Sequence, residues 1–141
     1  MSTLVVDASV AAKWFFDEDR AAEALRVLDA RHRLHAPDFL LIEFDNLIWK
    51  RVRRGEITAA EGRRTRRTLR RLPVEAHPSG PLLDLAYAVA VRTGRTVYDS
   101  LYVALAIVLK GRVVSADRRL CTALAGGPFS QYVLWVGDLA P

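Results

Sequence analysis

The chain has almost no cysteine, few histidines and no long apolar run. Its 141 residues include one cysteine, Cys121, and three histidines. A single thiol excludes a disulfide framework within the chain and a multi-cysteine zinc site. The opening apolar stretch ends at Asp7, too early for the apolar region of a signal peptide, and no run approaches the length of a membrane span. We therefore expect a cytoplasmic protein without membrane contact.

The residues that are present suit one globular domain spanning residues 1–141. Apolar residues make up 51% of the chain, enough to bury a core at this length. Short β-branched runs predict buried strands at residues 4–6, 113–114 and 132–136. Helical spacing of apolar residues predicts helices starting near Ala21, after Pro37 and near Leu82, and an interior helix over residues 102–109. This alternation predicts an α/β fold with a mainly parallel sheet, whose ligand sites lie at the carboxyl ends of strands.

Positive charge is concentrated in one segment. Residues 50–71 hold ten Lys or Arg against two Glu, a local charge of +8 within a chain of net +5. Gly55 is placed to end a helix, and Thr58 with Glu61 is placed to form a capping box that starts another. We expect a basic helical hairpin that binds a polyanion such as nucleic acid. A solvated, arginine-rich hairpin without a ligand is the alternative interpretation.

Four acidic residues stand out by their positions. Asp7 and Asp117 each follow an apolar run directly and precede a helical pattern, so both are expected at one rim of the sheet. Asp99 lies three residues after Thr96, at the start of the expected interior helix. Helix capping alone accounts for any of these three aspartates. Glu43 is different, because no cation lies three or four residues away on its own helix face.

Convergence of these four carboxylates would require a counter-charge, and a divalent cation supplies it. Oxygen ligands favour hard ions, so we expect Mg²⁺, with Mn²⁺ as the alternative. Such an ion suits phosphodiester hydrolysis by an activated water. Ser9, Asn46 and Ser115 are candidates to orient the ligands or waters. The histidines, His32, His35 and His77, show no ligand spacing and are interpreted as surface or loop residues.

The motifs that carry these acids resemble those of a known family. They are Asp7-Ala8-Ser9-Val10, Glu43 with Asn46, the segment from Tyr98-Asp99-Ser100 to Ala106, and Ser115-Ala116-Asp117-Arg118. Together they resemble the PIN-domain nucleases, especially the VapC toxins of toxin–antitoxin pairs. Ser115 stands where many relatives have threonine, which keeps the hydroxyl group. Asp45 adds a carboxylate about 200° around the helix from Glu43 and is expected outside the cluster.

The resemblance implies a three-layer α/β/α sandwich, a magnesium site formed by Asp7, Glu43, Asp99 and Asp117, and endoribonuclease activity. It also implies a homodimer and neutralisation by a VapB-like antitoxin protein. The candidates for RNA binding are the basic residues Lys50, Arg51, Arg63, Arg64, Arg66 and Arg67. In the family this region also contributes to dimer and antitoxin contacts.

Three alternatives stay open at this point. In the first, the chain is a PIN nuclease of RNA processing rather than a toxin. In the second, it is a non-catalytic RNA-binding module that kept the fold. A phosphorelay receiver also has acids at strand ends, but it requires an acidic pair after the first strand and a lysine after a late strand. Asp7 stands alone after the first strand, and Lys110 precedes the run at 113–114, so the sequence meets neither requirement of a receiver.

Overall fold

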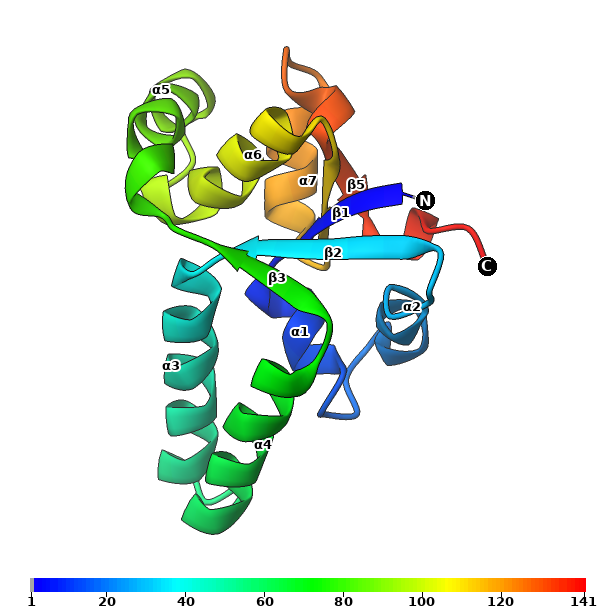
Figure 1. Ribbon diagram of the computed structural model, residues 1–141, viewed down its shortest axis with the longest axis vertical. Coiled ribbons are helices and arrows are strands. Elements are labelled where there is room, and N and C mark those ends of the chain that lie inside the picture. Colours follow the sequence, from blue (N-terminus) through cyan, green and yellow to red (C-terminus); the bar gives the residue numbers. More distant parts are fainter. Residues whose placement is uncertain (1) are drawn as a thin grey trace.

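The computed structural model describes residues 2–141 and forms one twisted parallel sheet with helices on both faces (Figure 1). The strands are β1 (Ser2–Val6), β2 (His32–Pro37), β3 (Val74–His77), β4 (Arg112–Ser115) and β5 (Val133–Trp135). The helices are α1 (Ala8–Lys13), α2 (Ala21–Arg26), α3 (Phe39–Arg53), α4 (Ala59–Arg71), α5 (Leu83–Thr93), α6 (Val97–Leu109) and α7 (Arg118–Ala125). Short 3₁₀ helices lie at Gly80–Leu82, Ser130–Tyr132 and Val136–Asp138.

The sheet has the order β3-β2-β1-β4-β5, and every neighbouring pair is parallel. Helices α1 to α4 lie on one side of it and α5 to α7 on the other, which is the predicted three-layer sandwich (Figure 1). The chain leaves β1 toward β2 and returns on the other side at β4. The carboxyl ends of β1 and β4 therefore flank the point where the winding reverses, the usual place for a ligand site in such folds.

The core is built from the residues that the apolar patterns selected. The valine side chains of β1 and β4 are fully buried, and α6 is buried on all sides from Ser100 to Ala106. Its last turn emerges from the interior, where Val108 is 59% exposed. Helix α2 is only six residues long, and Leu25, predicted on its apolar side, is exposed.

Two of the strands were not predicted. The expected surface or loop position of the histidines is wrong for His35 and His77, which lie on the neighbouring strands β2 and β3, and His32 also lies on β2. The polar sequence of these strands hid them, because only Leu34 and Ala36 of β2 are buried apolar side chains.

Helices α3 and α4 form a helical hairpin that extends away from the sheet (Figure 1). Gly55, at φ +75°, ends the first helix, and the predicted capping box of Thr58 and Glu61 starts the second. The helices approach closely at Gly62, where an added Cβ would lie 3.1 Å from the side chains of both Ile48 and Val52. In the described residues no helix is long and apolar enough to cross a membrane.

Candidate active site

Asp7 lies where β1 ends, and its carboxylate is held by three donors. Oδ1 accepts hydrogen bonds from the Ser9 hydroxyl at 2.6 Å and the Val10 amide at 3.1 Å, so Asp7 caps α1. Oδ2 accepts a hydrogen bond from the Ser115 hydroxyl at the end of β4. Asp7 can therefore cap α1 through Oδ1 and also take part in a functional site through Oδ2.

Both serines also bind the turn that follows β4. Ser9 Oγ accepts the amide of Ala116, and Ser115 Oγ accepts the amide of Asp117, each at 3.0 Å. Each hydroxyl thus donates to Asp7 and accepts from the backbone beside Asp117. This network fixes the ends of β1 and β4 relative to each other, and the structure places both serines in the supporting positions expected of them.

Asp7 is a charged group in an unfavourable environment. Its residue is only 7% exposed. Burial raises the pKa of Asp7 above its usual value, and the charge of Asp117 acts in the same direction, while the bonds from Ser115, Ser9 and Val10 lower it. No basic side chain pairs with Asp7 among residues 2–141. Its hydroxyl and amide donors orient the carboxylate without neutralising it.

Glu43 reaches the same region from the first half of α3. Its Oε1 accepts a hydrogen bond from the hydroxyl of Tyr102, which lies on α6, and it has no basic partner in the described residues. Burial raises the pKa of Glu43, and the charges of Asp7 and Asp99 add to this effect. Burial and the Glu43 charge also raise the pKa of Tyr102, so the phenol stays protonated as a donor.

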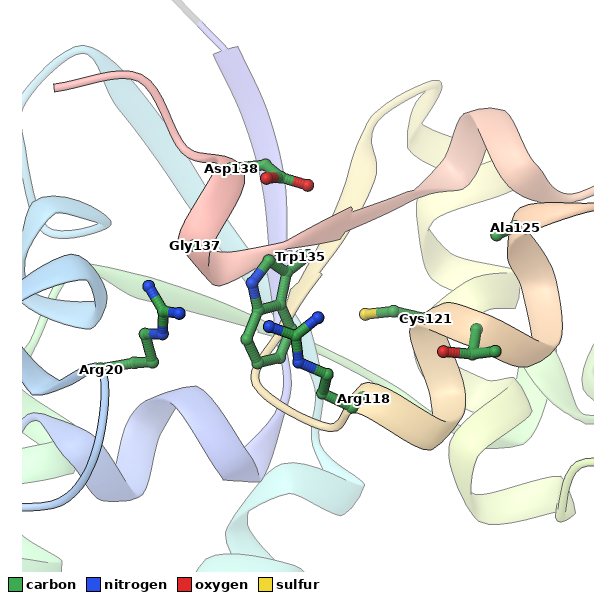
Figure 2. A pocket seen from close by; sticks show the side chains of 8 residues that line it. Arg20, Arg118, Cys121, Ala125, Trp135, Gly137 and Asp138 are labelled. Carbon is green, nitrogen blue, oxygen red and sulfur yellow. The ribbon is translucent and has the colours of Figure 1, made fainter.

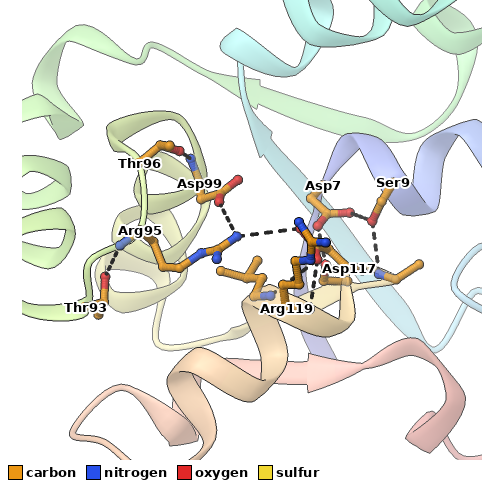
Figure 3. Close-up of polar contacts among 11 residues, drawn as sticks. Asp7, Ser9, Thr93, Arg95, Thr96, Asp99, Asp117 and Arg119 are labelled. Atoms are coloured by element: carbon orange, nitrogen blue, oxygen red, sulfur yellow. Dashed lines mark hydrogen bonds and ion pairs between the residues drawn. The ribbon is translucent and has the colours of Figure 1, made fainter.

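Asp99 and Asp117 share one arginine (Figure 3). A terminal guanidinium nitrogen of Arg95 lies 3.0 Å from Asp99 Oδ2 and 3.8 Å from Asp117 Oδ2. Asp117 Oδ1 caps α7 through the amides of Arg119 and Leu120. The capping box expected at Asp99 is only half formed, because Thr96 accepts the Asp99 amide but the Asp99 carboxylate turns to Arg95.

We call Asp7, Glu43, Asp99 and Asp117 the acidic rim. The charges of its members affect one another, because Asp7 and Asp99 raise the pKa of Glu43, and Asp117 raises the pKa of Asp7. No three of these carboxylates have ligand atoms that all lie within 4.8 Å of one another. Among residues 2–141, a different group of metal-ligating side chains, described below, meets that distance. Among residues 2–141, Arg95 is the one basic side chain that forms ion pairs with these acids, and it reaches only Asp99 and Asp117.

Two other polar residues of α3 differ in the contacts that they make. Asn46, a candidate supporting residue, is exposed and makes no side-chain hydrogen bond within residues 2–141. Asp45 forms a bidentate ion pair with Arg66 of α4, and both contacts are 2.7 Å long. This pairing agrees with the predicted position of Asp45 outside the cluster.

The candidate RNA-binding residues of the hairpin fall into two groups. Arg66 pairs with Asp45, and Arg51 pairs with Glu18 and Glu56 while lying over the Phe16 ring. The other four are exposed and have no ion pair in the described part of the chain; they are Lys50, Arg63, Arg64 and Arg67. Along the helix Arg54 lies roughly 16 Å beyond Glu43, so the hairpin tip is far from the rim.

A second polar region adjoins the rim at the start of α7. A cavity of about 410 Å³ opens there, and Figure 2 shows Arg20 and Arg118 on either side of Trp135. The guanidinium carbons lie 6.0 Å and 4.2 Å from the Trp135 ring centroid. One of these two cations, Arg118, follows Asp117 of the rim directly in the sequence.

Sequence reasoning missed Arg95, Tyr102 and this arginine pair. Arg95 and Tyr102 lie four residues before and three residues after Asp99, spacings that place both beside it. That signal was available in the sequence. The meeting of Arg20 with Arg118 depends on tertiary structure and leaves no local pattern.

Comparisons with known proteins agree with this geometry. The model of the PIN domain matches residues 4–123. Ribonuclease VapC3 of Pyrobaculum aerophilum is 35% identical, with 83% of this chain and 91% of the relative covered. Ribonuclease VapC9 of Mycobacterium tuberculosis is 36% identical, with 83% and 87% covered. A toxin–antitoxin complex from Klebsiella pneumoniae, at 14% identity, covers 96% of this chain and 99% of its own with a TM-score of 0.66, and it shows the shared fold. The chain therefore belongs to the PIN-domain family and is a VapC-type member of it.

Proposed function

We propose that this protein is a magnesium-dependent endoribonuclease and the toxin of a toxin–antitoxin pair. The observation that carries the proposal is the acidic rim, in which buried Asp7 and half-buried Glu43 are oriented by hydroxyl groups but not neutralised. Relatives named ribonucleases, at 35% and 36% identity over most of the chain, support the choice of RNA as the substrate.

The residues of the rim fit a hard divalent cation. All four offer carboxylate oxygens, which suit Mg²⁺ or Mn²⁺ better than softer metals. Burial is the main cause of the raised pKa values of Asp7 and Glu43, and neighbouring carboxylates add to it; a bound cation would favour the ionised form of both groups. Asp7, Glu43, Asp99 and Asp117 are the proposed ligands, directly or through water.

When bound, Mg²⁺ would acidify a water and stabilise charge on the phosphate oxygens. The chain's own residues prepare the site for this chemistry. Ser9 and Ser115 hold the Asp7 carboxylate, and Tyr102 holds that of Glu43. Arg95 holds Asp99 and lies close to Asp117, which limits the repulsion between these two acids before RNA arrives.

The proposed RNA path uses mainly cations that have no ion pair within residues 2–141. The exposed residues Lys50, Arg63, Arg64 and Arg67 offer charge to phosphates along the hairpin. Arg118 offers a second contact beside Trp135, whose ring adds an aromatic surface, while Arg20 at the same ring already pairs with Glu23. Arg51 and Arg66 already have acidic partners and are assigned the smaller share of RNA binding.

Partners follow from the relatives and from the fold. The toxin–antitoxin complex of Klebsiella pneumoniae matches nearly the whole of this chain, which supports a VapB-like antitoxin as partner. A homodimer, a location in the cytoplasm and a single domain over residues 1–141 are part of the same proposal.

RNA cleavage in Mg²⁺ tests the proposal directly. Asp7→Asn and Asp99→Asn are each expected to lower the cleavage rate at least about 100-fold, or ~2.7 kcal/mol of transition-state stabilisation, because each removes a charged metal ligand. The matched control is Asp84→Asn, which removes an exposed carboxylate from α5. Circular dichroism and thermal unfolding establish that the variants fold.

Two results would contradict it. Equal cleavage by the wild type and both variants would show that the acidic rim is not the active site. RNA binding without cleavage by the wild type in Mg²⁺ or Mn²⁺ would instead identify a non-catalytic RNA-binding module.

A further inference from the structure

We propose that His35, Glu75 and His77 form a second metal site, which binds a zinc-class transition-metal ion at the β2–β3 edge of the sheet. Among residues 2–141, they are the one group of three or more metal-ligating side chains whose ligand atoms all lie within 4.8 Å of one another. The proposal is independent of nuclease activity, because it uses none of the residues of the acidic rim.

The strand register brings the three side chains together. His35 on β2 is the partner of Glu75 on β3, and neighbouring partners in a sheet project from the same face. His77 lies two residues beyond Glu75 and therefore on that face as well. The alternate residues Leu34 and Ala36 point to the opposite face, where Ala36 lines a cavity with side chains of α3 and α4.

The distances suit a tetrahedral ion. His35 Nδ1 lies 2.9 Å from His77 Nε2 and 3.3 Å from a Glu75 carboxylate oxygen. Nitrogen and oxygen ligands about 2.0–2.1 Å from Zn²⁺ lie about 3.3 Å apart in a tetrahedron. Small side-chain rotations would therefore admit the ion in place of the direct contact between the two imidazoles.

The donor set selects a different metal from that of the acidic rim. Two imidazoles and one carboxylate favour Zn²⁺, Cu²⁺ or Ni²⁺, whereas a site made only of oxygens favours Mg²⁺. The His35 side chain is 13% exposed and that of Glu75 is 68% exposed. The site is thus backed by the sheet and open on the Glu75 side, where water completes the coordination.

Binding would connect the edge of the sheet to its interior. β3 is a four-residue edge strand, and its His77 carbonyl accepts the amide of Asp38, the residue before α3, at 2.7 Å. An ion held by both strands stabilises only the folded chain. At an ion concentration about 100 times its Kd, we expect the Tm to rise by roughly 5–10 °C.

Titration of the metal-free full chain with Zn²⁺ in excess Mg²⁺ tests the site. The wild type is expected to bind one equivalent of Zn²⁺ by calorimetry, and Co²⁺ is expected to give the visible absorption of a tetrahedral site. His77→Gln is expected to weaken Zn²⁺ binding at least 100-fold. Glu75→Gln, a substitution at an exposed position that cannot disturb the core, is expected to weaken it about tenfold or more.

The controls separate this site from others on the molecule. His32→Gln removes a histidine from the same strand but the opposite face, and Asp99→Asn alters the acidic rim. Both are expected to keep the full equivalent of Zn²⁺ and the rise in Tm. Absence of Zn²⁺ binding in the wild type, or unchanged binding in both His77→Gln and Glu75→Gln, would overturn the proposal. Loss of binding in Asp99→Asn alone would assign the ion to the acidic rim.

Discussion

The acidic rim and the basic hairpin, residues 50–71, both concentrate charge of one sign, but the fold treats them differently. At the rim, hydroxyl and amide donors hold Asp7 and Glu43, and one arginine, Arg95, serves the other two acids. In the hairpin, acidic side chains neutralise the inward arginines Arg51 and Arg66. The outward cations are left in solvent.

This difference shows which charges are reserved for ligands. Hydroxyl groups fix the direction of a carboxylate while leaving its charge available, whereas a bidentate ion pair uses the charge within the chain. This difference supports the proposal that the rim binds an external cation. It likewise supports the proposal that only the outer cations of the hairpin bind an external anion.

The strongest test of this comparison removes a hydroxyl from the rim. Ser115→Ala deletes the donor to Asp7 Oδ2 and the acceptor of the Asp117 amide. We expect Mg²⁺ affinity or cleavage to fall about 10- to 100-fold, the usual effect of removing a group that orients a metal ligand. Mg²⁺ titration of the cleavage rate measures it.

Ser115→Thr is the matched control, because it keeps the hydroxyl, and it is expected to keep most of the activity. If Ser115→Ala cleaved RNA with the wild-type dependence on Mg²⁺, the orienting role of the hydroxyl groups would be refuted.

The predictable part of the fold followed from strong local patterns. Runs of valine and leucine revealed β1, β4 and β5, and three strands alternating with helices were enough to predict an α/β fold with a parallel sheet, whereas the three-layer sandwich was implied by the family resemblance. β2 and β3 were missed because His-Arg-Leu-His-Ala-Pro and Val-Glu-Ala-His carry few β-branched residues. Strand conformation is imposed on β2 by pairing with β1 and by contact with α3, and on β3 by pairing with β2.

The candidate site was predictable in its residues and not in its contacts. Asp7 and Asp117 follow strands whose ends must meet at the rim, so their proximity follows from the fold class. The bond from Tyr102 to Glu43 and the approach of Arg95 to Asp117 depend on how α6 packs against α3 and α7, which no local pattern specifies. The pairing of Asp45 with Arg66 likewise required the hairpin to close.

The next test divides the hairpin. In an Asp99→Asn background, which is expected to bind RNA without cutting it, the combined Arg63→Gln, Arg64→Gln and Arg67→Gln variant is expected to bind more weakly. The slope of log K against log salt should fall by about 0.7–0.9 for each phosphate that the variant no longer neutralises. Filter binding or fluorescence anisotropy over a salt series measures both effects.

Arg51→Gln with Arg66→Gln is the control, since both side chains are already paired, and it should change the slope less. An unchanged slope in the triple variant would assign the outer face of α4 to a protein partner instead of RNA.

The smallest expected effect lies within the hairpin and concerns stability. The Arg66 hydrogen bonds are the main reason that the pKa of Asp45 is below its usual value of 3.8, so the ionised carboxylate stabilises the fold. That contribution is complete above the unfolded-state pKa and is lost as the pH falls through the folded-state pKa. Because both partners are about a third exposed or more, we expect Asp45→Asn to cost only about 0.5–1 kcal/mol at pH 7. Urea unfolding at neutral pH and over a series of pH values below 3.8 measures the difference, which should shrink as the pH falls through the folded-state pKa of Asp45. A cost that persists in acid would mean that Asp45 stabilises the fold through packing and not through its ion pair with Arg66.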